Sequence, residues 1–494
     1  MPDVFIIGGG PAGATAARLL ASWGWSVQVA DRSTRAIARP SLAESLPPST
    51  RKLLAFLGQL DVVDAAGFHP NHGNISRWAD VSHVTHTDAP GFHVSRAAFD
   101  RVLRRPARAA GARFIDAVVR RVDGTDPFRV CCVTGGGEIE TRRARYVLDC
   151  SGRAGVIARR GLRQVESRYR TIAIAAEWTC ARWPAGEQAH TIVESYKDGW
   201  AWSVPLSATR RQCTVMVDPH GGPGTKKAAL HTIYARETTK TSEIGARLAG
   251  ARQTSAPWAC DASLYHAPRA ADGGMLLVGD AASFIEPLSS AGVKKALTSA
   301  WRAAVVVNTC LAKPEMERAA LDFFVERERD VYEECRRLSA RFFNDASAVY
   351  ADPFWTARAD SMNGPSMPLS VQHDVELARN PDVRTAFDRL RRASLVRLRP
   401  APALRFEPAA AIEGREIVLR EALVLPGDAA PRRFAAGVDL PALVRLARQC
   451  DEVSTLISAY HTEVGPVPVQ GLLTGLSLLV ARHALIDINE DSSV

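Results

Sequence analysis

The chain has 494 residues, of which 46% are hydrophobic and 23% charged, and its formal net charge is +9 at pH 7. This balance is typical of a globular protein of about two to four domains, and it excludes a disordered, collagenous or small disulfide-stapled chain. The basic residues are dispersed, without interleaved aromatic residues or a helix-turn-helix pattern. We therefore expect no nucleic-acid partner.

Apolar runs and cysteines indicate the compartment. The longest apolar stretch, 472–486, is broken by Arg482 and His483 and falls short of the roughly 18 residues that span a bilayer. The nine cysteines include no C-x-x-C pair, which predicts neither a disulfide framework nor a metal site. Met1 and Pro2 lead directly into an apolar run without a basic signal segment. We expect a cytoplasmic protein with no membrane partner and no bound metal.

The first predicted unit is a strand, a glycine turn and a helix. Residues 4–7 form an apolar run typical of a buried parallel strand, and a G-x-G-x-x-G pattern follows at 8–13. A helix is predicted to about Trp23, and a second strand, 27–31, ends in Asp31, 18 residues after the last glycine. Such glycines allow a tight turn and a close approach of a pyrophosphate, while the acid binds a ribose. The pattern predicts a dinucleotide site.

Three segments follow in the predicted nucleotide-binding part. Residues 94–100 open a helix that ends near Gly111, and 147–153 read as a buried strand followed by Ser-Gly-Arg. The glycines at 135–137 lie between strand-like runs, where a hairpin turn is the better interpretation than a second dinucleotide site. The sequence thus shows one dinucleotide fingerprint and no dedicated nicotinamide domain.

Strand-like runs then alternate with turns and predict an antiparallel sheet. The runs are 171–178, 190–195, 200–204 and 212–217. The third run carries Trp200 and Trp202, and the alternation of a strand places both indoles on one face. Two tryptophans that pack a sheet against a helix would give the same pattern.

A second glycine block follows a buried strand at 275–278. It reads Gly279-Asp280-Ala281-Ala282, with Pro287 and Gly292 before a helix that runs to about Leu311. Together these blocks resemble FAD-dependent aromatic hydroxylases, the p-hydroxybenzoate hydroxylase-like superfamily. The resemblance implies that Asp280 binds the ribityl chain and that the helix N-terminus lies against the flavin, where its dipole stabilises negative charge.

The resemblance implies FAD as the cofactor and assigns its contacts to one set of residues. They are Gly8, Gly10, Pro11, Ala12, Gly13, Asp31, Arg32, Ser45, Arg96, Val119, Gly279, Asp280, Pro287, Gly292 and Val293. A solvent-exposed arginine at the start of a helix remains an alternative role for Arg96.

The segment around the two tryptophans is similar to the W-x-W-x-I-P signature of flavin-dependent halogenases. That family also uses a lysine, which receives hypohalous acid between flavin and substrate. The corresponding position here is Asn71, and no lysine occurs between Lys52 and Lys197. An amide cannot supply the required amine, so the resemblance implies a halogenase-like scaffold without halogenation.

Hydroxylation is the remaining chemistry that the resemblance implies. Reduced FAD takes up O2 to form a C4a-hydroperoxide, which an electron-rich ring attacks, and the protein excludes water and orients the ring. Electrons come from reduced nicotinamide or a reductase partner. The candidate catalytic residues are Trp200, Trp202, His72 and Glu44, of which the last two are candidate bases or hydrogen-bond acceptors. A structural role for His72 remains an alternative.

The pattern changes in the C-terminal part of the chain. A linker is predicted at 399–402, followed by short strands and then three helical stretches, at about 440–449, 453–460 and 468–484. Strands followed by helices resemble a small winged-helix module of peptide-recognition domains. Peptide binding, a dimerisation or lid role, and an inert extension all remain open.

These elements predict an α/β fold with a Rossmann-type FAD-binding domain, an inserted antiparallel substrate domain and a winged-helix-like α+β domain. The expected boundaries are 1–165 with 261–345 for the FAD-binding domain, 166–260 for the substrate domain, 346–400 for a helical connector and 401–494 for the C-terminal domain.

The combination resembles flavoprotein monooxygenases that mature tryptophylquinone cofactors, as in quinohemoprotein amine dehydrogenase. It implies a single-component FAD-dependent monooxygenase that hydroxylates a tryptophan in a polypeptide. The implied partners are an amine dehydrogenase small subunit and its crosslinking enzyme. Alternatives are a small-molecule phenol or indole hydroxylase or halogenase, a reductase of the geranylgeranyl type, and a flavin-bound maturation chaperone without catalysis.

Overall fold

The computed structural model describes residues 1–32, 41–181, 183, 184, 186–219, 227–363, 380–392, 396–426, 428 and 430–488. The chain divides into two compact units, Met1–Ser366 and Met367–Val494, and each has its own hydrophobic core. Among the described helices, none is long and apolar enough to cross a membrane.

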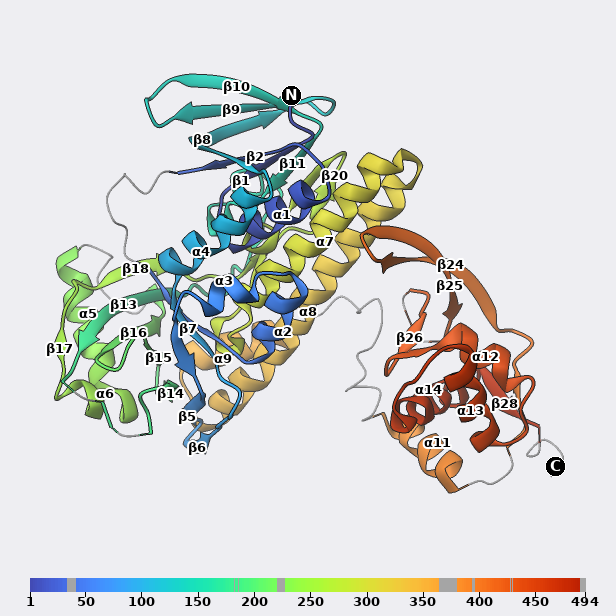
Figure 1. Cartoon of the computed structure of the whole chain (residues 1–494). Helices are drawn as coiled ribbons and strands as arrows, with labels where there is room; N and C mark the ends of the chain where they lie inside the picture. The colour runs from blue at the N-terminus through green and yellow to red at the C-terminus, as the bar shows by residue number, and fades with distance from the viewer. Residues whose placement is uncertain are drawn as a thin grey trace. The chain divides into compact units, whose positions relative to one another are not determined.

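An eight-stranded sheet forms the nucleotide-binding part of the first unit (Figure 1). Its order is β10-β9-β8-β2-β1-β11-β21-β20, and the strands from β8 to β21 run parallel. The bounds are β1 Val4–Ile7, β2 Val27–Asp31, β8 Arg113–Asp123, β9 Phe128–Thr134, β10 Ile139–Ala144, β11 Tyr146–Asp149, β20 Ala271–Asp272 and β21 Met275–Leu277. The glycines at 135–137 form the predicted hairpin turn between β9 and β10.

Three helices accompany this sheet: α1 Pro11–Ser22, α4 Arg96–Ala109 and α7 Gly292–Ala312. α1 follows β1 through the glycine turn and packs against both α4 and α7. Its apolar residues are buried on nearly every side, because alanine and glycine let neighbouring helices approach closely.

A second eight-stranded sheet forms the substrate part. Its path is β17-β13-β16-β15-β14-β5-β6, and β18 pairs with β13. The bounds are β5 Gly73–Trp78, β6 Val81–Val84, β13 Ile172–Thr179, β14 His190–Tyr196, β15 Gly199–Pro205, β16 Arg210–Val217, β17 Arg252–Gln253 and β18 Trp258–Asp261. Two of these strands come from residues 73–84, which the sequence places in the FAD-binding part. β5 joins through a parallel pairing with β14, whereas the other pairs are antiparallel.

Smaller elements complete the first unit. Two three-stranded sheets have the orders β3-β7-β4 and β12-β19-β22. Their bounds are β3 Ala43–Leu46, β4 His69–Asn71, β7 Gly91–Ser95, β12 Gln164–Val165, β19 Tyr265–His266 and β22 Ser283–Phe284. The helices are α2 Ser49–Phe56, α3 Leu60–Asp64, α5 Lys227–Thr239, α6 Glu243–Leu248, α8 Glu317–Val349 and α9 Pro353–Met362.

The second unit is α+β and has its hairpins before its main helices, the order that the sequence predicts. Its elements are α11 Pro381–Arg392, β23 Leu398–Pro400, β24 Arg405–Glu413, β25 Glu416–Val424, β26 Phe434–Ala435, β27 Val438–Asp439, α12 Leu440–Ala447, α13 Val453–Glu463, α14 Val469–Ala481 and β28 Leu485–Asp487. β23 pairs with β28 and so joins the two ends of the unit.

The structure divides the predicted connector, 346–400. Helix α9 packs against α8 in the first unit, whereas α11 packs against α14 in the second. The predicted fold class is confirmed: a Rossmann-type α/β sheet, an antiparallel substrate sheet and a C-terminal α+β unit.

Candidate functional site

The turn between β1 and α1 requires glycine at two positions. Gly8 has a φ of +95°, and a Cβ there would lie 2.6 Å from the Cys150 carbonyl oxygen. A Cβ on Gly13 would lie 1.9 Å from the carbonyl oxygen of Gly8. Gly10 caps α1 without a side-chain hydrogen bond, so the first N–H groups of the helix remain open to an anion.

A cavity, here called the nucleotide cavity, lies at this turn. Its lining includes most of the residues that the sequence predicts for the dinucleotide: Gly8, Gly10, Pro11, Ala12, Asp31, Arg96, Asp280, Gly292 and Val293. Other lining residues are Gly9, Asp100, Arg104, Cys150, Ser151, Gly152, Val278 and Ala296. Gly13 lies beneath this lining and permits the close packing of turn and helix.

Asp31 is held at the end of β2 by two contacts. Its carboxylate accepts the Gly9 N–H at 3.2 Å and pairs with Arg104 at 2.8 Å. Arg104 also donates to the Gly9 carbonyl oxygen at 2.7 Å. The sequence does not identify Arg104, because nothing in its spacing relates α4 to the glycine turn.

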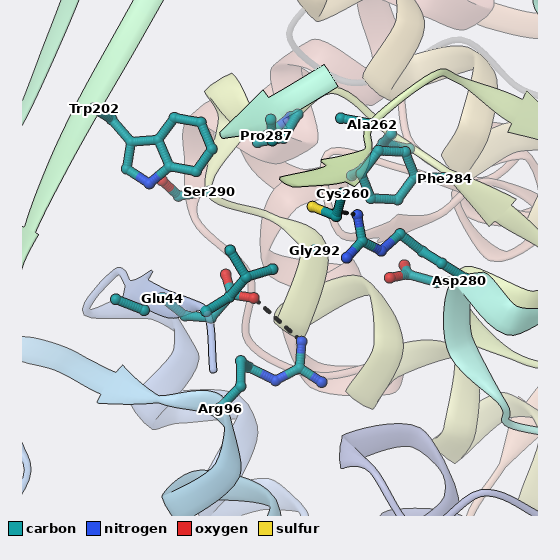
Figure 2. Close-up of a pocket in the computed structure, with 15 residues that line it drawn as sticks. Glu44, Arg96, Trp202, Cys260, Ala262, Asp280, Phe284, Pro287, Ser290 and Gly292 are labelled. Atoms are coloured by element: carbon teal, nitrogen blue, oxygen red, sulfur yellow. Dashed lines mark hydrogen bonds and ion pairs between the residues drawn. The ribbon is translucent and has the colours of Figure 1, made fainter. Parts of the chain in front are cut away.

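A second cavity, here called the ring cavity, continues from the first. It shares Arg96, Asp280 and Gly292 with the nucleotide cavity. Figure 2 shows Trp202 and Pro287 on one side of it and Glu44 and Arg96 on another. The remaining lining residues are Leu42, Ala43, Arg153, Ala173, Cys260, Ala262, Phe284, Ile285 and Ser290.

Arg96 lies at the junction of the cavities. Its guanidinium contacts Glu44 and Asp100, each at 3.2 Å. Burial alone would lower the pKa of Arg96, but its carboxylate neighbours raise it, so the guanidinium stays charged. Burial raises the pKa of Glu44, and Arg96 opposes that shift. The junction therefore presents a fixed positive charge beside a carboxyl group that accepts a proton more readily than usual.

Asp280 also lies at the junction. It follows Gly279, whose φ of +65° permits the short turn after β21. The Asp280 carboxylate lies 3.4 Å from the ammonium of Lys295, which donates to the Ser283 carbonyl oxygen at 2.6 Å. The sequence does not single out Lys295, a buried residue in the first turn of α7.

The N-terminus of α7 faces the same junction. The turn at Pro287–Ser289 ends in Ser290, with a φ of +49°, and α7 begins at Gly292 without a side-chain cap. Gly292 lines both cavities, and Val293 lines the nucleotide cavity. The open N–H groups and dipole of a 21-residue helix favour negative charge here.

Trp200 and Trp202 lie on one face of β15, as the alternation predicts, with ring centroids 5.0 Å apart. Their surroundings differ. Trp202 lines the ring cavity, whereas Trp200 is 1% exposed and packs against Trp78, whose ring centroid lies 6.1 Å away. Of the two, only Trp202 is placed to touch a molecule in the cavity.

Asn71 and Ser45 are joined in a buried network. The Asn71 amide nitrogen donates to Ser45 Oγ at 3.0 Å and to the Leu46 carbonyl oxygen at 3.2 Å, and its oxygen accepts the Gly73 N–H. The hydroxyl oxygens of Ser45 and Thr191 lie 2.7 Å apart. Asn71 is therefore fully engaged in holding strands together, and Ser45 does not line either cavity.

Three predicted site residues lie elsewhere. His72 bonds the Thr87 carbonyl oxygen through Nδ1 at 2.9 Å and stacks on His86, so the structure does not bring it to either cavity. Arg32 is exposed after β2. Val119 is buried in β8 and lines neither cavity. Within the part of the chain that is described, no cluster of three potential metal ligands is found.

Comparisons with known proteins identify the family and the fold. A family model described as tryptophan halogenase matches residues 71–394. A tryptophan 2-halogenase of Chondromyces crocatus is 29% identical, with 72% of this chain and 70% of the relative covered. The flavin-dependent halogenase armH4 of Armillaria mellea is 28% identical, with 65% and 68% covered.

Two solved structures share the fold over nearly the whole chain. The flavin-dependent halogenase CmlS has a TM-score of 0.78 at 22% identity and covers 98% of this chain and 96% of its own. The peptidyl tryptophan dihydroxylase QhpG, described as essential for tryptophylquinone cofactor biogenesis, has a TM-score of 0.68 at 23% identity and covers 94% and 100%.

Proposed function

This chain belongs to the tryptophan halogenase family, and from that premise we propose that it hydroxylates an aromatic ring instead of halogenating it. It is a flavin-dependent enzyme of the halogenase-like monooxygenase type. The proposed substrate is a tryptophan side chain within a polypeptide. The proposed co-substrate is O2, and the proposed electron source is reduced nicotinamide or a reductase partner.

The described residues fit FAD. There is no room for a side chain at Gly8 or Gly13, so the turn is formed by backbone alone and a pyrophosphate can approach it closely. The N-termini of α1 and α7, neither with a side-chain cap, face the cavities. Asp31 is the proposed partner of a ribose hydroxyl and Asp280 that of the ribityl chain, and Arg96 lines both cavities. Bound here, FAD would supply the activation of O2 that amino-acid side chains cannot supply.

The presence of asparagine at position 71 is the reason for proposing hydroxylation instead of halogenation. The family resemblance implies a lysine at this position as the carrier of halogen. The Asn71 amide is 3% exposed, uncharged and engaged in three hydrogen bonds to its neighbours. Among the described residues that line the two cavities, none is a lysine. A halogenation step would therefore lack its amine.

The residues around the ring cavity have roles that follow from their chemistry. Trp202 and Phe284 supply apolar walls that exclude water, which strengthens electrostatic interactions inside the cavity. Glu44 is the proposed proton acceptor, because burial raises the pKa of its carboxyl group and Arg96 orients it at 3.2 Å. Arg96 in turn is the proposed partner of negative charge that develops in the cavity.

The polypeptide substrate is the finer part of the proposal. QhpG is a peptidyl tryptophan dihydroxylase, and this chain matches its full length. The C-terminal unit does not by itself discriminate between substrates, because the halogenase CmlS matches it as well. We therefore base the choice of a tryptophan side chain on QhpG together with Asn71, and an amine dehydrogenase small subunit with its crosslinking enzyme is the proposed partner class.

The proposal is tested by incubating the FAD-loaded protein with three substrates under the same reducing conditions. A tryptophan-containing peptide or protein subunit, free tryptophan and a simple phenol are each supplied with reduced nicotinamide, a flavin reductase, O2 and bromide. Mass spectrometry then identifies the product. Oxygen added to the polypeptide tryptophan is the expected result, and an Asp280→Ala variant provides the catalytically silent control.

Other products would overturn parts of the proposal. Bromination of any substrate would overturn hydroxylation and support the halogenase alternative, which the 28–29% identical relatives favour. Oxygen added to free tryptophan or phenol but never to a polypeptide would support a small-molecule hydroxylase. A protein that binds FAD but consumes no O2 beyond the background would support a maturation chaperone.

A further inference from the structure

Five aromatic side chains form a continuous row that begins in the ring cavity and ends near the surface. In order they are Trp202, Trp200, Trp78, Trp355 and Tyr350. We propose that this aromatic path carries a one-electron oxidising equivalent out of the ring cavity to Tyr350. The proposal rests on the proposed function only in that FAD occupies the cavity.

The distances along the aromatic path support electron transfer. Successive ring centroids lie 5.0, 6.1, 5.5 and 6.0 Å apart, so each ring is in contact with the next. The path uses four of the ten tryptophans in the chain. Indole and phenol are among the side chains that lose an electron most readily, so this composition suits hole transfer better than a row of phenylalanine would.

The beginning of the path lies in the cavity. Trp202 is drawn beside Pro287 and Ser290 in Figure 2, at the N-terminus of α7. It is partly buried, whereas Trp200 and Trp355 behind it are 1% and 0% exposed. Trp200 and Trp355 are therefore shielded from solvent, whereas Trp78 between them is partly buried.

The hydrogen bonds of Trp78 and Trp355 favour onward transfer of the oxidising equivalent. The indole N–H of Trp78 donates to the Phe342 carbonyl oxygen at 2.9 Å, and that of Trp355 donates to the Tyr196 carbonyl oxygen at 3.0 Å. Peptide carbonyls are poor proton acceptors. An oxidised Trp78 or Trp355 thus keeps its proton as a radical cation, which takes an electron from the next ring without waiting for a proton to return.

The last residue has a proton acceptor. The Tyr350 hydroxyl lies 3.4 Å from both the exposed carboxylate of Asp80 and the Ser195 carbonyl oxygen, and of these two acceptors only the carboxylate can take the proton. When Tyr350 gives one electron to Trp355, its phenol proton passes to Asp80 and a neutral tyrosyl radical remains. An external thiol then gives one hydrogen atom to Tyr350 and becomes a thiyl radical, while Asp80 releases the phenol proton to solvent. The electron that Tyr350 lost has reduced the oxidant in the cavity, and the protein is restored.

The consequence would be protection of the site. A one-electron oxidant derived from O2, such as a hydroxyl radical, that forms near Trp202 without a substrate to attack would otherwise modify the indole and destroy the cavity wall. It is reduced instead by the electron that the aromatic path delivers through Trp202, and it takes its proton from solvent. Transfer of the oxidising equivalent to Tyr350 moves the damage to a position where a small reductant can repair it. Trp200, which does not line the cavity, then has a role as the first relay behind Trp202.

The test uses light as the trigger, so that it is independent of hydroxylation. Illumination of the FAD-loaded protein excites the oxidised flavin, a one-electron oxidant that takes an electron from Trp202. Transient absorption and electron paramagnetic resonance then follow the protein radicals. We expect a tyrosyl radical in the unchanged protein, loss of that radical in Trp78→Phe, and a tryptophan radical without a tyrosyl radical in Tyr350→Phe.

A control variant and two further outcomes distinguish failure of the aromatic path from failure of flavin binding. Trp183→Phe removes a buried indole that packs in the core on the other side of the substrate sheet and is not part of the aromatic path, and it should leave the tyrosyl yield unchanged. Flavin binding without any protein radical, or an undiminished tyrosyl signal in both Trp78→Phe and Tyr350→Phe, would overturn the path. Failure to bind flavin would overturn the proposed function instead, and flavin absorbance distinguishes the two.

Discussion

At the scale of single residues, Asp280 is the point where the two cavities meet. Its carboxylate lines both of them and lies 3.4 Å from the buried ammonium of Lys295. The pairing fixes the direction of the carboxylate before any ligand arrives, which reduces the entropy lost on binding. Lys295 is buried, and its charge is balanced by Asp280 together with the buried carboxyl group of Glu328.

Replacement of this carboxylate should release the cofactor. We expect Asp280→Ala to weaken FAD binding roughly 10- to 150-fold, because a hydrogen bond to a charged group contributes about 1.5–3 kcal/mol. Titration of the apoprotein with FAD, followed by flavin fluorescence, measures the change. Asp272→Ala removes an exposed carboxylate from β20 and should have no effect. Unchanged affinity in Asp280→Ala would remove the ribityl assignment.

Glu286 gives a residue-scale prediction about pH. Burial raises the pKa of Glu286 to about 7 from an ordinary value of 4.5, and the Arg358 charge and the Trp200 indole oppose the shift. At pH values between 4.5 and about 7, the Glu286 carboxyl group is therefore protonated in the native state and ionised in the unfolded chain. The free energy of unfolding should fall as pH rises from 4.5 to about 7, by about 3 kcal/mol in total.

A neutral substitute should remove that dependence. Glu286→Gln is expected to unfold at a higher temperature than the unchanged protein at pH values above the raised pKa, and at a similar temperature in acid below 4.5. Calorimetry at several pH values measures both effects. Glu315→Gln, at an exposed position, is the control. Equal pH profiles for the unchanged protein and Glu286→Gln would contradict the assignment of this carboxyl group.

Sequence patterns identify some of these residues and miss others for a physical reason. The glycines and Asp280 are readable because each performs a local task at a fixed spacing from a strand. Arg104 pairs with Asp31, and Lys295 pairs with Asp280. Neither pairing can be predicted from the sequence, because the position of a basic residue on a helix does not indicate which acid it contacts. Glu286 likewise looks like an ordinary acid beside a proline until the fold buries it.

At the scale of elements, the strand–turn–helix units are predictable and the composition of the substrate sheet is not. The apolar run at β1 and its glycine turn define the unit within 20 residues. β5 and β6 instead join a sheet whose other strands begin at Ile172, and the parallel pairing of β5 with β14 spans more than a hundred positions. The sequences of such short polar strands do not indicate which strand each one pairs with.

The close packing of α1 on the glycine turn makes an element-scale prediction. Alanine at Gly13 would gain about 1 kcal/mol in helix propensity, but its Cβ would lie 1.9 Å from a backbone oxygen. Overpacking of this kind costs about 1–3 kcal/mol or more, so the clash decides. We expect Gly13→Ala to lower the unfolding temperature and weaken FAD binding together.

The control for this clash is a glycine in open space. A Cβ at Gly250 meets nothing within 4 Å, and Gly250→Ala should leave thermal unfolding and flavin binding nearly unchanged. Thermal unfolding followed by circular dichroism compares the two variants. If Gly13→Ala were as stable as Gly250→Ala, the helix would have moved away from the turn and the geometry of the phosphate site would be wrong.

At the scale of the whole molecule, the hydrophobic core of the second unit is separate from the clusters that fill the first unit. The core of the second unit draws on α11 to β28 alone, and the described residues that line the two cavities all belong to the first unit. Stability and flavin binding should therefore respond separately to damage in each unit. Sequence composition predicts a change of pattern near residue 400, whereas the contacts place the division before α11, whose apolar face packs on α14.

Two matched leucines test this independence in the full-length protein. Leu20 in α1 and Leu443 in α12 are both 0% exposed, so alanine at either should cost about 2–5 kcal/mol. Calorimetry with simultaneous flavin fluorescence separates unfolding from flavin release. Leu443→Ala should lower one transition and leave the flavin-release temperature unchanged, and Leu20→Ala should lower that temperature. A single transition that both variants shift equally would show that the two cores unfold as one, because independent cores cannot share the cost of a cavity in either.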